Sequence, residues 1–505
     1  MADLFSDTVD HRRAEVKQAV KSAADGMRAE GVQPRDYVEQ LSWLFFLKAF
    51  EEAENAREEE AAFSAAFEGD GGPAHAYARI LQGEVRWPEW TKRKPDDMLA
   101  FVNGELFPHL RSLAEKEPRL QGDPLAERFR RIFSEVKNHQ SKGSSFARVV
   151  EQVDRLSFSS ETDVDTLSEI YERLLQDVAQ VSGYAGEFYT PRHIIRAMVQ
   201  VVKPRLGDRV YDPCFGSGGF LFEAAAAIRE HAGMMSGDDL ERFRSRTVFG
   251  RELGALPYLI GTMNLILHGI PRAQLELVNT LEVHDEALPE KAKYDVVLAN
   301  PPYGGMLAET PRNFNVPSKA TETLFLQHIM KSLARGGRAA VVVPEGVLFR
   351  HGPDLKVRRR LVDEFRLHAV LSLPAGVFLP YTGVKTNVLF FDRPEDGRTT
   401  GEVFYYELEN DGFELKTTRK PQPGSQLPDF LARVARRETD DERAWTVSVE
   451  AIRKNGYDLS ARNPHRQTLD EHVPAHRLVS EIKTREERIL DLLGELEELL
   501  EGGEA

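Results

Sequence analysis

Short apolar runs alternate with helical segments through the middle of the chain, between residues 151 and 395. Runs at 209–211, 247–250, 294–299 and 338–343 have the length of buried strands. This alternation predicts a doubly wound α/β sheet. Further expected elements are strands at 367–373 and 386–391, the latter an antiparallel edge strand, and helices at 220–230, 237–244 and 323–334, the last ending at Gly336 and Gly337.

The flanking regions follow other patterns. Residues 1–150 are predicted to form a helical N-terminal domain, with an apolar stripe along 36–60 that we expect to lie in a core. Residues 396–470 are predicted to form a small mixed extension with a strand at 403–408, and residues 471–505 a heptad-like helix. The residues of the first stripe are Val38, Leu41, Trp43, Leu44, Phe45, Phe46 and Phe50.

Composition narrows the class of protein. A chain of 505 residues is too long for one hydrophobic core, so two or three domains are expected. No apolar run approaches the ~18 residues of a membrane span, and residues 1–18 lack the pattern of a signal peptide. The single cysteine cannot form a disulfide within the chain. These features favour a cytoplasmic enzyme with no membrane contact.

The net charge of −15 is unfavourable for DNA binding, because duplex binding relies on neutralising phosphates with Lys and Arg. Two basic clusters, at 128–131 and 356–360, are more typical of solvated helix faces than of DNA contacts. We therefore expect another subunit to supply sequence recognition and much of the affinity for DNA.

The strongest candidate for chemistry is Asn300-Pro301-Pro302-Tyr303, directly after the 294–299 strand. The Asn300 side-chain carbonyl and a proline-fixed backbone carbonyl can accept hydrogen bonds from a flat, conjugated amino group. Such bonds draw the nitrogen toward tetrahedral geometry and free its lone pair. Pro301 and Pro302 lock φ and hold one loop shape, while the Tyr303 ring can stack on the substrate. The alternative interpretation is a turn that only closes the strand.

A glycine-rich turn follows the first strand and opens the 220–230 helix. Its residues are Asp212, Pro213, Cys214, Phe215, Gly216, Ser217, Gly218 and Gly219. The glycines allow a ligand near the backbone, and free N–H groups at the helix start favour a carboxylate or phosphate. The second strand leads to Glu252, where an acidic residue commonly binds the ribose hydroxyls of an adenosine. A solvated strand-end charge is the alternative interpretation of Glu252.

The glycine turn followed by Asn300–Tyr303 resembles S-adenosylmethionine-dependent amino-methyltransferases. The closest resemblance is to the modification subunit of Type I restriction–modification systems, which methylates adenine N6 in DNA. A third segment, 186–192, resembles the cofactor-binding segment of this family. From its residues, Thr190 is predicted to be a helix N-cap and Pro191 the first helical residue. The chain departs from the family at Asn279, where an Asp is common.

The resemblance implies a Rossmann-like methyltransferase core over about 150–395, with a helical N-terminal domain and a C-terminal helix. Asn300, Pro301, Pro302 and Tyr303 would then be catalytic, on an adenine turned out of the duplex, and no metal would be needed. The residues implied to bind S-adenosylmethionine are Glu187, Phe188, Tyr189, Thr190, Pro191, Arg192, Asp212, Gly216, Ser217, Gly218, Gly219 and Glu252.

The implied partners are DNA and a specificity subunit flanked by two modification subunits, and the sequence leaves open whether a restriction subunit joins them. The apolar stripe of 471–505 must be buried, and we expect this helix to bind the specificity subunit; packing on the N-terminal domain of the same chain is the alternative.

Two other functions fit parts of the pattern. A methyltransferase acting on a protein glutamine amide can use the same Asn-Pro-Pro-Tyr chemistry, and a catalytically silent structural subunit is the second alternative. Cys214 follows a proline, as a nucleophile for cytosine carbon-5 would, but it lies in the glycine turn and is better explained by packing. Residues 304–320 are expected to form a mobile loop beside the site, either closing over a base or serving as an ordinary surface loop.

Overall fold

The structure is a computed structural model in which one compact unit extends to Ala461. The residues it describes are 18–67, 78–158, 190–282, 289–311, 313–379, 381–416, 419–460 and 463–465, with Lys483 and Glu486. The helix predicted at 471–505 therefore lies almost entirely outside the described residues. Every helix in the described ranges is too short or too polar to span a bilayer.

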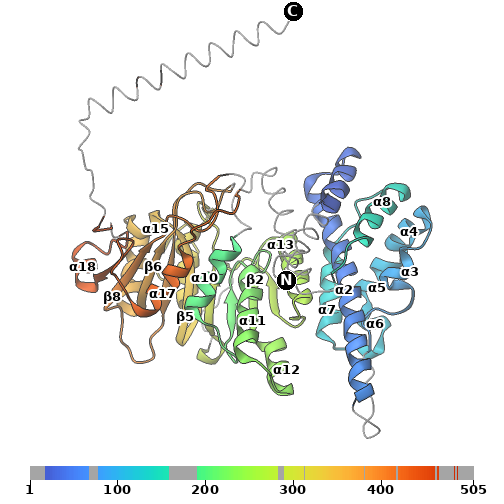
Figure 1. The fold of residues 1–505 in the computed structure, drawn as a ribbon, viewed down its shortest axis with the longest axis horizontal. Helices are drawn as coiled ribbons and strands as arrows, with labels where there is room; N and C mark the ends of the chain where they lie inside the picture. The colour runs from blue at the N-terminus through green and yellow to red at the C-terminus, as the bar shows by residue number, and fades with distance from the viewer. Residues whose placement is uncertain are drawn as a thin grey trace, which may run out of the picture. The chain divides into compact units, whose positions relative to one another are not determined.

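One mixed sheet organises the part of the chain from β1 to β9 (Figure 1). In the described residues it has nine strands in the order β3-β2-β1-β4-β5-β7-β6-β8-β9. Their bounds are β1 Val210–Asp212, β2 Val248–Glu252, β3 Gln274–Leu277, β4 Tyr294–Ala299, β5 Leu333–Pro344, β6 Arg366–Ser372, β7 Thr386–Asp392, β8 Glu402–Glu407 and β9 Ala444–Ser448. The run from β3 to β5 is parallel, as predicted, so the carboxyl ends of β1, β2 and β4 share one edge.

Helices cover both faces of this sheet because the strands are apolar on both sides. In β4, Val296 and Leu298 face one core while Val297 and Ala299 face the other. The first face carries α10 (Arg192–Val202), α11 (Gly219–Ala232), α12 (Gly237–Arg246) and α17 (Leu427–Arg436) (Figure 1). The second carries α14 (Thr321–Ser332), α15 (Gly346–Phe349), α16 (Pro353–Glu364) and α18 (Val449–Lys454).

The N-terminal region is helical, as predicted. Its helices are α2 (Pro34–Phe67), α3 (Trp87–Trp90), α4 (Pro95–Phe101), α5 (Phe107–Arg111), α6 (Leu113–Lys116), α7 (Pro124–Glu135) and α8 (Gly143–Asp154), preceded by helical residues 18–29. All seven residues of the predicted stripe in α2 are buried. The Trp43 ring meets Phe107 of α5 edge-on at 5.0 Å, and Phe50 meets Phe129 of α7 in the same way at 5.0 Å.

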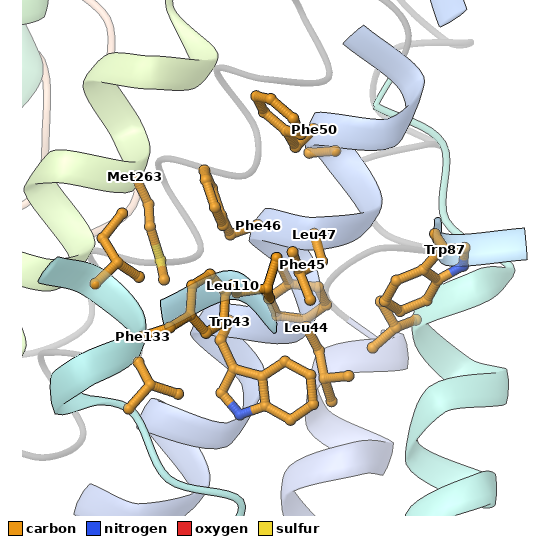
Figure 2. Close-up of a cluster of buried hydrophobic side chains, with 14 of the residues drawn as sticks. Trp43, Leu44, Phe45, Phe46, Leu47, Phe50, Trp87, Leu110, Phe133 and Met263 are labelled. Atoms are coloured by element: carbon orange, nitrogen blue, oxygen red, sulfur yellow. The ribbon is translucent and has the colours of Figure 1, made fainter. Parts of the chain in front are cut away.

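Helix α13 (Ala255–Leu267) joins the N-terminal helices to the sheet region. Leu256, Leu259, Ile260, Met263 and Ile266 belong to the same hydrophobic cluster as the stripe of α2. Figure 2 shows Met263 beside Phe46 and Phe133. A helix whose mean composition is strongly apolar can be buried on several sides, and α13 packs on α2 while also supporting the glycine turn.

Two expected details of the sheet are wrong. β7 lies between β5 and β6 and is not an edge strand; the first six of its seven residues are buried, and β3 and β9 take the edges. The helix α14 ends at Ser332, before Gly336 and Gly337, because Leu333 is already extended and begins β5. Gly336, at φ +74°, instead turns the backbone inside this strand and donates its N–H to the Arg393 carbonyl at 2.7 Å.

The two basic clusters are largely structural. Arg358 is 1% exposed and donates to the carbonyls of Val347, Arg350 and Tyr457 at 2.7–2.8 Å. In the first cluster Phe129 is buried, while Arg130 and Arg131 both pair with Glu127. A buried charge without a partner is costly, and these arginines already have partners within the chain. Much of the positive charge in the two clusters is therefore compensated without DNA.

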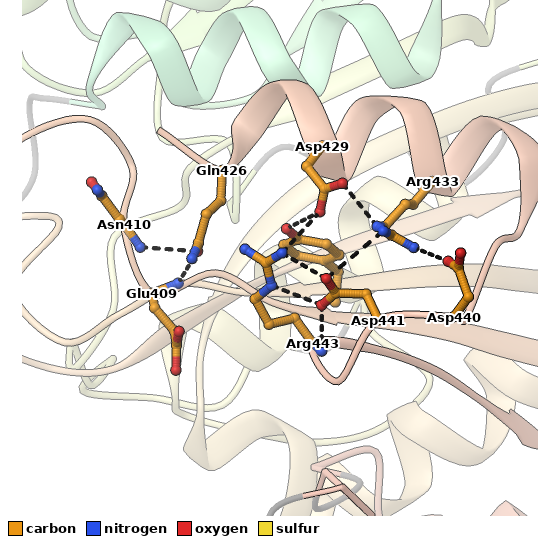
Figure 3. Close-up of polar contacts among 9 residues, drawn as sticks. Glu409, Asn410, Gln426, Asp429, Arg433, Asp440, Asp441 and Arg443 are labelled. Carbon is orange, nitrogen blue, oxygen red and sulfur yellow. Dashed lines mark hydrogen bonds and ion pairs between the residues drawn. The ribbon is translucent and has the colours of Figure 1, made fainter. Parts of the chain in front are cut away.

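The strands β8 and β9 extend the sheet, and an ionic network ties α17 to them (Figure 3). The Tyr406 hydroxyl donates to Asp429 at 2.7 Å, and Arg433 donates to the same carboxylate at 2.9 Å. Arg443 pairs with Asp441 at 2.7 Å. Several charges that share partners hold one geometry better than isolated surface pairs do.

Candidate functional site

The carboxyl ends of β1, β2 and β4 bring three predicted segments together. Val210 and Tyr211 pair with β4, and Asp212 pairs with Gly250 of β2. The glycine turn leaves β1, Glu252 ends β2, and Asn300 follows β4. In doubly wound sheets this edge is the usual ligand site.

The glycine turn needs its glycines for backbone reasons. Gly216 and Gly218 have φ of 53° and 83°, a region that side chains with a Cβ rarely adopt. Helix α11 begins at Gly219, immediately after the turn. The turn is held by Asn264 of α13, whose Nδ2 donates to the Ser217 carbonyl at 3.1 Å.

Glu252 reaches back to the same turn. One carboxylate oxygen accepts the Gly216 N–H at 3.0 Å and the other accepts the Gly254 N–H at 2.8 Å. Glu252 therefore lies directly against the glycine turn and holds its backbone through a carboxylate oxygen.

Asp212 is a buried carboxyl group, 1% exposed, whose Oδ1 accepts the Cys214 N–H at 3.0 Å. Burial raises the pKa of Asp212 to about 8; the Cys214 N–H opposes this shift and the charge of Glu252 adds to it. Burial also raises the pKa of the Cys214 thiol. A thiol nucleophile needs the opposite shift, so packing remains the better explanation of Cys214.

The Asn300 amide has one satisfied side and one open side. Its Nδ2 donates to the Thr190 hydroxyl oxygen at 2.9 Å. Its Oδ1 is buried and has no hydrogen-bond partner among the described residues. A buried acceptor without a partner costs about 1–3 kcal/mol, and such groups are often found where a ligand completes the bonding.

Tyr303 and the loop that contains it are held by α14. The Thr321 hydroxyl donates to the Pro302 carbonyl at 3.0 Å, and the Thr321 N–H donates to the Gly305 carbonyl at 3.1 Å. Burial raises the pKa of the Tyr303 hydroxyl, and the nearby Asn300 side chain offsets this only in part. The phenol therefore stays neutral, as suits a ring that stacks on a base.

The predicted loop 304–320 is fixed at several points in the described residues. Met306 bridges Ala320, and Gln327 of α14 both donates to the Val316 carbonyl and accepts the Val316 N–H, each at 2.9 Å. Its mobility stays a prediction.

The segment 186–192 is only partly described. Glu187, Phe188 and Tyr189 lie outside the described residues. The N-cap prediction for Thr190 is wrong: Pro191 is the N-cap and α10 begins at Arg192, because the Thr190 hydroxyl is engaged by the Asn300 amide and not by its own helix. The Arg192 guanidinium stacks over Phe222 of α11 at 4.8 Å.

Asn279, where the chain departs from the family pattern, forms hydrogen bonds with residues that follow it closely in the sequence. Its Nδ2 donates to Glu282 at 2.9 Å and its Oδ1 accepts the Leu281 N–H at 3.2 Å. The next residue, Thr280, donates its hydroxyl to the Pro213 carbonyl at 2.6 Å and so supports the glycine turn.

The supporting residues Asn264, Thr280 and Thr321, together with Gly261, were missed by sequence reasoning. They lie 19 to 67 residues along the chain from the residue that each one contacts, so no local spacing reveals them. Gly261 and Asn264, polar or small positions inside the apolar α13, were the one available signal, because such residues are unusual in a buried helix.

Comparisons with known proteins show the family of the chain. Residues 162–472 match the family model described as N-6 DNA Methylase, and residues 16–153 match the HsdM N-terminal domain. The chain is 32% identical to the Type I restriction enzyme EcoEI methylase subunit of Escherichia coli, over 96% of this chain and 97% of that one. It is 30% identical to the EcoKI methylase subunit of Escherichia coli K12, over 80% of this chain and 72% of that one.

Two solved structures are similar as well. A modification subunit of a Type I restriction enzyme from Vibrio vulnificus has a TM-score of 0.77 at 31% identity, covering 91% of this chain and 99% of that one. A chain from a study of assembly and conformational transition in a Type I restriction–modification system has a TM-score of 0.69 at 36% identity, covering 98% and 99%. The chain therefore belongs to the N-6 DNA methylase family, as a methylase subunit of the Type I restriction–modification systems.

Proposed function

We propose that this chain transfers a methyl group from S-adenosylmethionine to N6 of an adenine turned out of duplex DNA, using Asn300, Pro301 and Tyr303. The observation that carries the proposal is the buried Asn300 Oδ1, an acceptor without a partner among the described residues at the ligand edge of the sheet. An amino group is the kind of donor that would satisfy it.

The residues of the glycine turn fit the cofactor. Gly216 and Gly218 leave the backbone open to close approach, and Glu252 stands at the end of β2, where it can accept hydrogen bonds from ribose hydroxyls. Asp212 is buried with its pKa raised, so a positively charged ligand nearby would favour its ionised form. When bound, S-adenosylmethionine supplies a methyl group on a positively charged sulfur.

The chain prepares the amine for this methyl group. Asn300 Oδ1 and the Pro301 carbonyl accept its two hydrogens and draw the nitrogen toward tetrahedral geometry, which frees the lone pair. The freed lone pair would form the new nitrogen–carbon bond while the carbon–sulfur bond of the sulfonium breaks and the sulfur leaves, with that electron pair, as a neutral thioether. The nitrogen would then release one of its protons to solvent, restoring a neutral amine. Because these acceptors are fixed before the reaction, they need no reorganisation during it.

The Tyr303 ring stacks on the base after it leaves the helix. Unstacking a base costs a few kcal/mol, and an aromatic face in the pocket recovers part of that cost. The Thr321 hydroxyl lies within hydrogen-bond distance of the Pro302 and Gly305 carbonyls, which stand on either side of Tyr303 in the chain. Thr321 therefore fixes the position of the Tyr303 ring relative to the Pro301 carbonyl.

DNA recognition requires a second protein. The net charge of −15 opposes phosphate binding, and the basic clusters are mostly paired or buried. We therefore assign sequence recognition to a specificity subunit flanked by two copies of this chain, with a restriction subunit added in systems that also cleave. The 36% identical chain from a study of complex assembly in a Type I restriction–modification system supports a role within such a complex.

The test is a methyl-transfer assay with tritiated S-adenosylmethionine. The full chain, assembled with a Type I specificity subunit, is given unmethylated duplex DNA in one arm and whole-cell protein in the other. The proposal predicts label in DNA, recovered as N6-methyladenine after digestion. Label in a protein glutamine, or label in neither arm, would contradict it.

A further inference from the structure

The side chain that holds the Asn300 amide belongs to a different segment of the chain. The Thr190 hydroxyl oxygen lies 2.9 Å from Asn300 Nδ2, across 110 residues of sequence. Thr190 is 9% exposed, so water does not readily replace it. Nδ2 donates to Thr190, the Tyr303 hydroxyl also lies beside the Asn300 side chain, and Oδ1 is left without a partner among the described residues.

Orientation matters because the two ends of an amide are opposite in hydrogen bonding. Oδ1 accepts a hydrogen bond from an amine, whereas Nδ2 is only a donor and would face the amine with hydrogens of its own. The two orientations have nearly the same shape, so packing alone does not choose between them. A hydroxyl fixed beside the amide holds its plane in place and stabilises the observed orientation, in which the hydroxyl accepts from Nδ2 and Oδ1 faces the other way.

Thr190 is itself held rigidly. It precedes Pro191, whose carbonyl accepts the N–H groups of Ile194 and Ile195 at 2.9 and 3.1 Å in the first turn of α10. His193, the second residue of α10, pairs with the buried Asp411 at 2.8 Å. A hydroxyl on such a fixed element holds its partner more sharply than one on a loose loop.

We propose that Thr190 is a positioning residue for methyl transfer: it fixes the orientation of the Asn300 amide so that Oδ1, and not Nδ2, faces the adenine amine. This inference rests on the proposed function, since it needs Asn300 to act on the amine. It gives Thr190 a role in the chemical step, distinct from the cofactor contact that the family resemblance implies for the same residue.

The test compares Thr190→Val, which removes the hydroxyl but keeps the shape, with Thr190→Ser, which keeps the hydroxyl. Each full-length variant is assembled with the specificity subunit and assayed for kcat, for KM toward DNA and for cofactor affinity by calorimetry. Thr190→Val is expected to lower kcat by roughly ten- to a hundredfold, the range for groups that orient a functional side chain. KM toward DNA should stay near wild type, and Thr190→Ser should restore most of kcat. Because Thr190 is also implied to contact the cofactor, kcat is measured at saturating cofactor, where any loss of cofactor affinity does not lower it.

A matched control separates this role from general loss of a buried hydroxyl. Thr400 is 4% exposed and bonds Phe365 and Leu367 far along the chain from the site, so Thr400→Val should keep kcat. The inference is overturned if Thr190→Val behaves like Thr400→Val, or if it weakens cofactor binding while kcat at saturating cofactor is unchanged. Both results leave the proposed function standing, because that function is tested separately by Asn300→Ala and by the assay of label in DNA and in protein.

A double substitution tests the orientation directly. In Asn300→Asp the side chain ends in two equivalent acceptors, so no wrong orientation exists. Adding Thr190→Val to Asn300→Asp should therefore cost little further activity, in contrast to its effect beside Asn300. An equal loss in both backgrounds would show that Thr190 acts by another route.

Discussion

Gly261 of α13 packs so closely on the glycine turn that a Cβ built there would lie 2.5 Å from the Gly216 carbonyl oxygen. The same helix carries Met263, which is buried among side chains of α2 and α7. Helix α13 thus connects the N-terminal helical core to the proposed cofactor turn. Disturbing its two sides should have different consequences.

On the side of the turn, the added Cβ of Gly261→Ala would clash with the Gly216 carbonyl and with the Phe215 ring at 2.6 Å. Relieving this clash requires the backbone of the glycine turn to move. We expect weaker cofactor binding, by about tenfold, and a loss of roughly 1–3 kcal/mol in stability. Gly237→Ala is the control, because a Cβ at Gly237 meets nothing within 4 Å. Calorimetric titration of both variants checks this, and equal cofactor affinity in the two would refute it.

On the side of the helical core, Met263→Ala should lower the free energy of unfolding by about 2–5 kcal/mol, through lost burial and the cavity left behind. Met234 is fully exposed, so Met234→Ala should change it by less than about 0.5 kcal/mol. Urea unfolding of the two variants measures the difference. Similar midpoints would mean that α13 does not share the core of α2.

The loop of Pro302 and Tyr303 depends on one hydroxyl of α14. Thr321→Val removes the hydrogen bond to the Pro302 carbonyl but keeps the shape of the side chain. We expect kcat to fall by about tenfold, with partial recovery in Thr321→Ser, while cofactor affinity is retained because Thr321 does not touch the glycine turn. Methyl-transfer rates at saturating cofactor provide the measurement, and an unchanged kcat in Thr321→Val would exclude this role.

The cofactor-free chain should lose stability as pH rises. Burial raises the pKa of Asp212 from 3.8 to about 8. The protonated carboxyl therefore contributes its full stabilisation of the folded state below pH 3.8, and this stabilisation is lost as pH rises through about 8. The difference in stability amounts to at most about 1.4 kcal/mol per pH unit. The Asn side chain of Asp212→Asn cannot ionise. Urea unfolding should therefore show the free energy of unfolding of this variant rising relative to that of wild type between about pH 6 and about pH 8.5. A difference that does not vary with pH would contradict the buried, protonated carboxyl.

The sequence predicted the sheet well where its signal is local. Strand β4 occupies the predicted residues, and the turn after β1 stands where its glycines indicated. It failed for β7, because six buried residues in a row fit an interior strand as well as an edge strand. Strand β3 was missed because three of its four residues are exposed, which leaves no apolar run.

The sequence indicates the residues of the proposed site but not the contacts that support them. Asn300 and Glu252 follow strand ends, which a periodic pattern locates. The bonds from Thr190 and Thr321 join segments that only the folded chain brings together, and a threonine before a proline indicates a helix start far more often than a distant partner.

The most direct test of the account is Asn300→Ala in the assembled methyltransferase, measured for cofactor affinity and for methyl transfer to DNA on the same preparation. The account predicts cofactor binding within about twofold of wild type and methyl transfer lower by roughly a hundredfold or more, the loss expected for one preorganised polar group. Tyr303→Phe should stay partly active, and Tyr303→Ala should not. Methyl transfer by Asn300→Ala at the wild-type rate would contradict the central claim that this amide prepares the adenine amine.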